Sequence, residues 1–161
     1  MRVNVGKKPP SLTFPQANDV KKIIKMGDIM SNGTNQKDLR FINLDITTRQ
    51  ISYYYSSGVF LGLFKKQKNK ELTRLGSVVF SQDISVVMRL VVFLILEDFI
   101  FFDYYKNRDL NSVEKNIKEH YHLSGSTLSR RAENVKSWIE WCDVIINEQK
   151  IFIEEGELER N

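Results

Sequence analysis

Three charged residues near the C-terminus are of the types that a metal-dependent nuclease uses. Asp143 precedes Glu148-Gln149-Lys150, and such nucleases hold Mg²⁺ with acidic side chains and activate a water molecule. Only four residues separate Asp143 from Glu148, so both would flank one short hairpin, whereas the acids of such a site converge from separate strands of a larger sheet. We therefore interpret Glu148 and Lys150 as turn charges and expect no catalytic residue in this chain.

The histidines and the cysteine are too few for a structural zinc site. Such a site takes four ligands at characteristic spacings, and this region offers His120, His122 and the single cysteine, Cys142. The sequence also has no glycine-rich phosphate loop and no serine nucleophile elbow. We expect no metal, no cofactor and no enzymatic activity, and any nuclease domain would lie outside this chain.

One polar segment in the first half has the chemistry of a helix that reads DNA. Thr47 can cap a helix over about residues 48–58, in which Ile51 and Tyr55 lie four apart and face the core. Short polar groups and long hydrogen-bond donors share the opposite side, which suits close approach in a major groove. These residues are Thr47, Thr48, Arg49, Gln50, Ser52 and Tyr53.

Four of these side chains have a specific contact that they could make with a duplex. Arg49 could make two hydrogen bonds to guanine and Gln50 two to adenine. Thr47 or Thr48, at the start of the helix, could meet a phosphate. The alternative interpretation is the solvated face of an ordinary helix.

Basic residues follow this helix in a segment with a hairpin pattern. Residues 59–64 and 71–73 have the composition of strands, and residues 65–70 form the turn between them. Lysines in that turn would contact flanking phosphates or the minor groove, which adds salt-sensitive affinity without reading the sequence. They are Lys65, Lys66, Lys68 and Lys70, and the alternative is a solubilising turn.

Further helices must hold these segments in place. Apolar spacing predicts a first helix over 16–30 and a short second helix over 35–42. Residues 83–105 predict one long helix that is buried in the protein and does not span a membrane. Arg89, Glu97 and Asp98 interrupt its apolar run, and these charges would be costly in lipid.

The second half repeats the plan at low sequence identity. A helix over 113–120, capped by Ser112, leads through a turn at 121–123 into a helix that opens at Ser124 and runs to Trp141 or Cys142. Residues 144–146 and 151–153 predict a second short hairpin. The open face of the helix that begins at Ser124 would contact DNA. The alternative is that this face has a structural role or docks another protein. Its residues are Ser126, Thr127, Arg130, Arg131 and Asn134.

Three helices followed by a hairpin resemble the winged helix-turn-helix family. The resemblance rests on residues 37–39 and 46–54 for the helix, turn and recognition helix, and on residues 61–63 and 72–76 for the wing. Residues 124–141 are similar to a helix of the tandem winged-helix regions that accompany type II restriction endonucleases. The resemblance implies a mainly α protein with small β-wings, acting as the recognition module of a restriction system whose nuclease domain is separate.

The charge is divided unevenly along the chain. Residues 1–80 hold 14 Lys or Arg against 5 Asp or Glu, a net of +9, and residues 81–161 hold 10 against 15, a net of −5. The first half therefore suits a polyanion. Residues 1–5 lack the apolar core of a secretory signal and the lone cysteine cannot form an internal disulfide, so we expect a cytoplasmic protein.

The sequence predicts four parts. They are a basic arm over 1–15, a first winged helix-turn-helix domain over 16–80, a second over 81–155 and an acidic tail over 156–161. We expect sequence-specific binding of double-stranded DNA, with a nuclease domain or subunit and a second copy of the chain as further partners, and no membrane. A transcriptional regulator of the same fold and a protein-interaction adaptor remain as alternatives.

Overall fold

Side chains just before five of the seven helices in the described residues satisfy the first backbone N–H groups and fix where those helices begin. The computed structural model describes residues 6, 13–33 and 43–153, so the predicted helix over 35–42, the acidic tail and most of the basic arm lie outside the described residues. Asp19, Thr47, Thr73, Asp98 and Asp109 all accept hydrogen bonds from the first turn that follows them.

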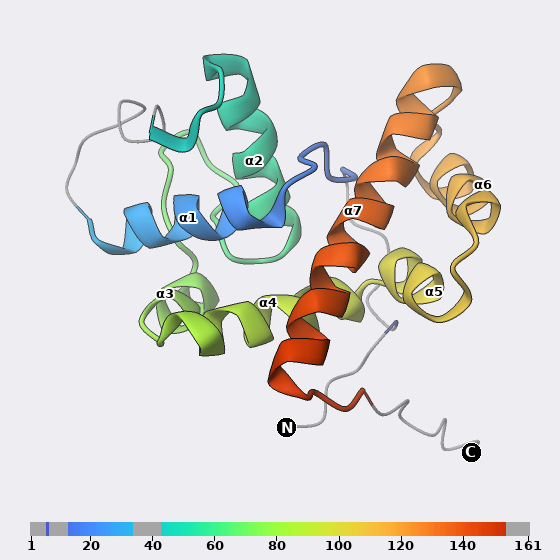
Figure 1. The fold of residues 1–161 in the computed structure, drawn as a ribbon. Coiled ribbons are helices and arrows are strands. Elements are labelled where there is room, and N and C mark those ends of the chain that lie inside the picture. The colour runs from blue at the N-terminus through green and yellow to red at the C-terminus, as the bar shows by residue number, and fades with distance from the viewer. Residues whose placement is uncertain (1–5, 7–12, 34–42, 154–161) are drawn as a thin grey trace, which may run out of the picture.

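The described residues are mainly helical, as predicted. The described residues form seven helices, which Figure 1 labels: α1 (Val20–Ser31), α2 (Thr48–Phe60), α3 (Arg74–Phe80), α4 (Ile84–Glu97), α5 (Phe99–Asn107), α6 (Leu110–Tyr121) and α7 (Gly125–Gln149). Among the described helices, none combines the length and the apolar character that crossing a bilayer requires.

The predicted long helix over 83–105 is in fact two helices. Asp98 has an extended backbone conformation and is buried, and its carboxylate accepts hydrogen bonds from the backbone N–H groups of Ile100 and Phe101. It therefore ends α4 and caps α5. The break lets α5 pack against both α6 and α7.

The predicted strands are largely wrong. Residues 59–60 complete α2, residues 74–76 begin α3, and residues 144–146 lie within α7. In the described part of the chain, strand-like pairing is limited to one antiparallel bridge between Phe64 and Leu72. The apolar stripe of α7 continues through Cys142 to Ile145, both buried, so helical packing takes residues that we expected in a second hairpin.

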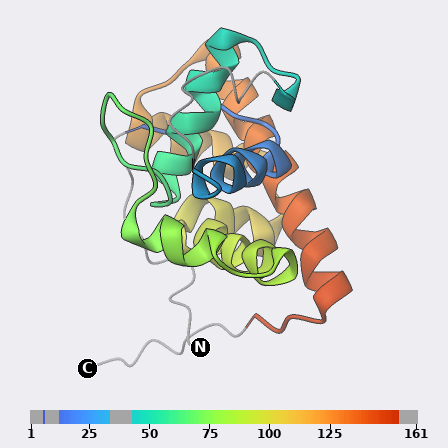
Figure 2. The ribbon, with the colours of Figure 1, turned by 90° about the vertical axis from the view of Figure 1, so that its left-hand side faces the viewer.

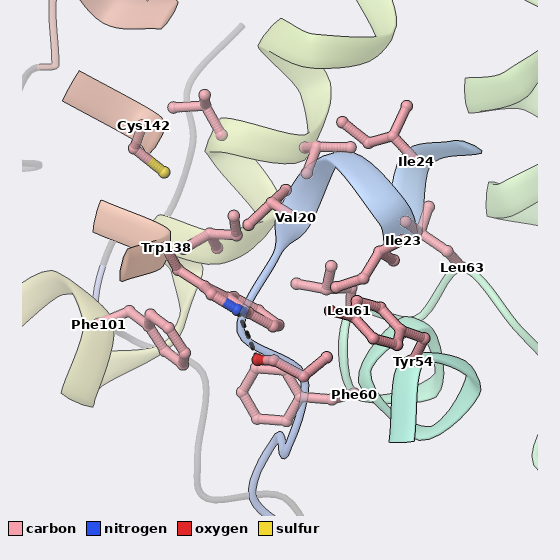
Figure 3. Packing of buried hydrophobic residues seen from close by; sticks show 14 of the residues in the cluster. Val20, Ile23, Ile24, Tyr54, Phe60, Leu61, Leu63, Phe101, Trp138 and Cys142 are labelled. Carbon is pink, nitrogen blue, oxygen red and sulfur yellow. Dashed lines mark hydrogen bonds between the residues drawn. The ribbon is translucent and has the colours of Figure 1, made fainter. Parts of the chain in front are cut away.

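The two halves of the chain share one hydrophobic core. Phe14 stacks on Phe101 of α5 with ring centroids 5.7 Å apart, and Phe60 of α2 meets the Trp138 ring of α7 edge to face at 6.3 Å. Figure 3 shows the rings of Phe60, Phe101 and Trp138 beside α1 residues such as Val20 and Ile23. Helices α4 and α7 thus connect the α1–α3 side of the molecule with the α5–α6 side (Figure 1).

Candidate nucleic-acid interface

The polar side of α2 is open, as the sequence predicts. Ile51, Tyr54 and Tyr55 are buried, and the opposite side leaves Thr48, Arg49, Ser52 and Ser56 exposed. Thr47 and Gln50 form a reciprocal capping box, in which the Thr47 Oγ1 accepts from the Gln50 N–H at 3.3 Å and the Gln50 Oε1 accepts from the Thr47 N–H at 2.9 Å. The first turn of α2 is therefore held rigidly with its polar side outward.

Internal hydrogen bonds orient the polar side chains of α2. The Arg49 Nε donates to the Tyr53 hydroxyl at 2.8 Å, and the guanidinium lies 5.8 Å from the Tyr53 ring centroid. This bond does not use the two terminal nitrogens of Arg49, which are the ones that would meet guanine. The Gln50 oxygen serves the capping box, so Gln50 is less suited than Arg49 to read a base through two hydrogen bonds.

The lysine-rich loop over 65–71 packs along one edge of α2. The Tyr55 hydroxyl donates to the Lys65 carbonyl at 2.5 Å and accepts from the Glu71 N–H at 3.3 Å. The Lys65 ammonium lies 2.9 Å from the Glu71 carboxylate and lowers the pKa of that carboxyl. Lys70 lies over the Tyr55 ring at 5.9 Å.

These contacts divide the four predicted wing lysines into two pairs. Lys65 and Lys70 are engaged with groups of the loop and of α2, whereas Lys66 and Lys68 are exposed at the tip of the loop. Thr48 and Ser52 precede Tyr55 by seven and three residues, so they lie on the edge of α2 that faces the loop.

The start of α7 lies at the same end of the molecule as the start of α2 (Figures 1 and 2). Ser126 and Arg130 are exposed, and Thr127 and Arg131 are half-buried. Burial, together with the neighbouring charge of Arg130, lowers the pKa of Arg131, and Tyr53 of α2 is close enough to oppose that shift. The N-terminal ends of α2 and α7 lie at the same end of the molecule in two perpendicular views (Figures 1 and 2).

Asn134 does not join this surface. Its side chain is buried, and its amide Nδ2 donates to the Gln16 carbonyl at 3.0 Å. We expected it on the open face of α7 beside Arg130. The prediction is wrong because α1 begins at Val20, so Gln16, which we expected at the start of the first helix, lies before α1 and covers α7 at this level.

Helices α6 and α7 form a tightly joined pair. His122 has a left-handed backbone conformation with φ of 54°, and α7 begins at Gly125, so the turn spans three residues. A bidentate ion pair braces the preceding corner, because the Arg108 guanidinium contacts both oxygens of Asp143 at 2.6 and 2.7 Å. Sequence analysis missed Arg108, although its place between two helices is a signal for a capping residue.

The other chemical candidates lie apart from this surface. Asp143 is engaged with Arg108, and Glu148 lies near the end of the same helix, where the sequence predicted a turn. Cys142 is buried, and burial raises the pKa of its thiol strongly. The described residues include no group of three or more potential metal ligands.

The described residues form a mainly helical protein with an open polar side on α2, exposed lysines on the loop that packs against α2, and two arginines near the start of α7. By sequence, the chain belongs to the family described as Domain of unknown function (DUF7226), whose model matches residues 22–147. This match spans both predicted domains. No curated protein and no solved structure matches the sequence.

Proposed function

We propose that this chain binds double-stranded DNA through the end of the molecule where α2 and α7 begin. We call this surface the basic face. It comprises Thr47, Thr48, Arg49, Gln50, Ser52 and Tyr53 at α2, Lys65, Lys66, Lys68 and Lys70 on the loop, and Ser126, Thr127, Arg130 and Arg131 at α7. The proposal rests on one observation, namely that the polar side of α2 is open, with exposed loop lysines beside it and with Arg130 and Arg131 of α7 at the same end of the molecule (Figures 1 and 2).

In this proposal α2 enters the major groove. Its outer side carries small side chains, Thr48 and Ser52, that allow close approach, and Arg49 supplies the long donor to a base edge. The Tyr53 hydroxyl holds Arg49 through its Nε, so less side-chain entropy is lost when the guanidinium binds.

Phosphate contacts would come from the two borders of the basic face. Lys66 and Lys68 reach the backbone on the loop side, and Arg130 and Arg131 reach it on the α7 side. The short hydroxyl side chains of Ser126 and Thr127 lie in the first turn of α7, where backbone N–H groups favour an anion.

We propose two winged helix-turn-helix units as the finer description of the fold. The loop closed by the Phe64–Leu72 bridge behind α2 supports the first unit, and the α6–turn–α7 pair supports the second. As biological role we favour the recognition module of a restriction system in the cytoplasm, with the nuclease domain outside this chain. A transcriptional regulator of the same fold is the second candidate, since the basic face would serve it equally well.

Salt dependence of duplex binding tests the proposal. The full chain is titrated against a fluorescent duplex of random sequence while salt rises from about 50 to 200 mM, and we expect a steep loss of affinity. The double variant Arg130→Ala with Arg131→Ala should flatten the salt slope, and the variant Lys25→Ala on α1 is the control. A chain with no measurable affinity at low salt would refute DNA binding and favour the adaptor alternative.

Selection of a preferred site separates the two biological roles. A pool of duplexes enriched by the immobilised chain yields the recognised sequence, and footprinting on DNA surrounding its own gene shows where that sequence occurs. A regulator would protect its own promoter, whereas a restriction module would prefer one short site wherever it occurs.

A further inference from the structure

A groove lies between α1, α4 and the C-terminal half of α7, away from the basic face. It encloses about 710 Å³. In Figure 1, α1 lies above α4 and α7 runs diagonally past both. Val144 in the groove is 14 residues beyond Arg130, which corresponds to about 21 Å along the helix axis. A molecule in the groove would therefore leave the basic face open.

The floor of the groove is apolar and unusually exposed. Ile84 at the start of α4 is 62% exposed and Val144 on α7 is 52% exposed, and both line the groove together with Met88 and Trp141. Scattered exposed apolar residues are ordinary, but a contiguous set in a concave site is typical of a binding surface.

The walls of the groove have the spacing that receives a helix. On α7 the lining residues recur at helical intervals of three and four, as Ser137, Glu140, Trp141, Val144, Ile145 and Glu148. The opposite wall uses Val20, Ile24 and their neighbours on α1. The exposed face of α7 that carries Val144 beside Ile84 and Met88 is an apolar surface on which an amphipathic helix can lay its apolar side, as in helix-in-groove recognition.

The charges around the groove select the partner's chemistry. The α7 wall carries Glu140 and Glu148 and no basic lining residue, and the α1 wall carries Asp19 and Asp28 together with Lys21 and Lys25. Glu140 also faces Lys136 on its own helix, at 4.0 Å in an exposed pair that is weak. The rim is therefore net acidic, although the whole chain has a net charge of +4.

We infer that this groove docks an amphipathic helix of a partner protein whose apolar stripe is flanked by lysine or arginine. The apolar stripe would cover Ile84, Met88 and Val144. The flanking cations would face Glu140 and Glu148, which favours a basic helix over an acidic one. This inference does not depend on DNA binding.

Two synthetic peptides of about 18 residues, long enough to form a helix, test the inference. Both carry the same leucine stripe at intervals of three and four, and the flanking positions are lysine in one and glutamate in the other. Each is titrated into the isotope-labelled full chain, and amide shifts are followed by NMR. We expect the lysine peptide to shift signals of the α1 and α7 walls, and the glutamate peptide to bind at least about tenfold more weakly.

Matched variants place the binding in the groove. Val144→Lys should abolish binding of the lysine peptide, because it replaces an apolar contact with a charge that repels the peptide, whereas Val78→Lys on α3, where the valine is 54% exposed, should leave it unchanged. Equal binding of both peptides, no binding of either, or shifts confined to residues outside the groove would overturn the inference. A dimer of the chain that Val144→Lys dissociates would also overturn it, because a second copy would then be the occupant.

Discussion

The indole N–H of Trp138 donates to the carbonyl oxygen of Ala17 at 2.9 Å, and this bond joins residues 121 positions apart in the chain (Figure 3). Both residues are buried. The segment that leads into α1 is thereby held against the middle of α7. Because α2 packs on α1, the same bond helps to fix the basic face, to which both halves contribute.

Trp138→Phe should destabilise the whole molecule. The change removes a buried hydrogen bond, leaves the Ala17 carbonyl without its donor and reduces core volume, so we expect a loss of about 2 kcal/mol or more. Urea unfolding followed by circular dichroism measures it, with Trp141→Phe as the control at a half-buried position. Two separate transitions, or equal losses for both variants, would contradict a single shared core.

Arg49→Ala should lower sequence preference more than general affinity. If Arg49 meets a base, its loss should weaken the preferred duplex by about 1–3 kcal/mol and unrelated duplexes much less. Competition binding with the preferred and a scrambled duplex measures the difference. The same loss on every duplex would show that Arg49 contacts only the backbone.

The loop lysines should differ in how much they contribute to DNA binding. Lys66→Ala or Lys68→Ala should weaken binding to all duplexes alike. Each should also reduce the slope of log affinity against log salt concentration by about 1. Lys65→Ala should have a smaller effect, because Lys65 is already paired with Glu71 at 2.9 Å. Salt titrations of the three single variants compare them directly, and equal slopes would argue against this order.

Gly76→Ala should disturb the junction between the loop and α3. A Cβ atom at Gly76 would lie 2.1 Å from the Leu63 carbonyl oxygen, a backbone atom that cannot move aside cheaply. We expect a destabilisation of about 1–3 kcal/mol. Thermal unfolding measures it against Gly33→Ala, where the nearest atom would be 3.6 Å away; similar melting temperatures for the two variants would refute the clash.

Cys142 should resist alkylation in the folded protein. Its burial raises the thiol pKa strongly, so the reactive thiolate is suppressed even at mildly alkaline pH, where a free thiol of pKa about 8.5 is half ionised. Iodoacetamide at that pH, read by mass spectrometry, should modify the chain in urea and not in buffer. Rapid modification in buffer would mean that the core around α7 opens readily.

The orientation of α2 could be predicted because its signals are local. The Thr47 cap, the spacing of Ile51 and Tyr55 and the polar residues between them all lie within one short segment. Apolar runs such as residues 59–64 and 144–146 are ambiguous by contrast, since periodicity does not separate a short buried strand from a buried helical turn. Tertiary packing decides between the two structures, because α2 extends through residues 59–60 and α7 includes residues 144–146.

The sequence by itself determined the helical character, the Thr47 cap and the polar side of α2, because these depend on residues a few positions apart. Only the tertiary structure decided that Asp98 divides the long apolar segment, that Asn134 is buried under Gln16, and that α2 and α7 begin at the same end of the molecule (Figures 1 and 2). Each of these outcomes depends on contacts between distant segments. Burial of apolar surface between distant segments stabilises these contacts, and the local spacing of residues does not show which segment covers which.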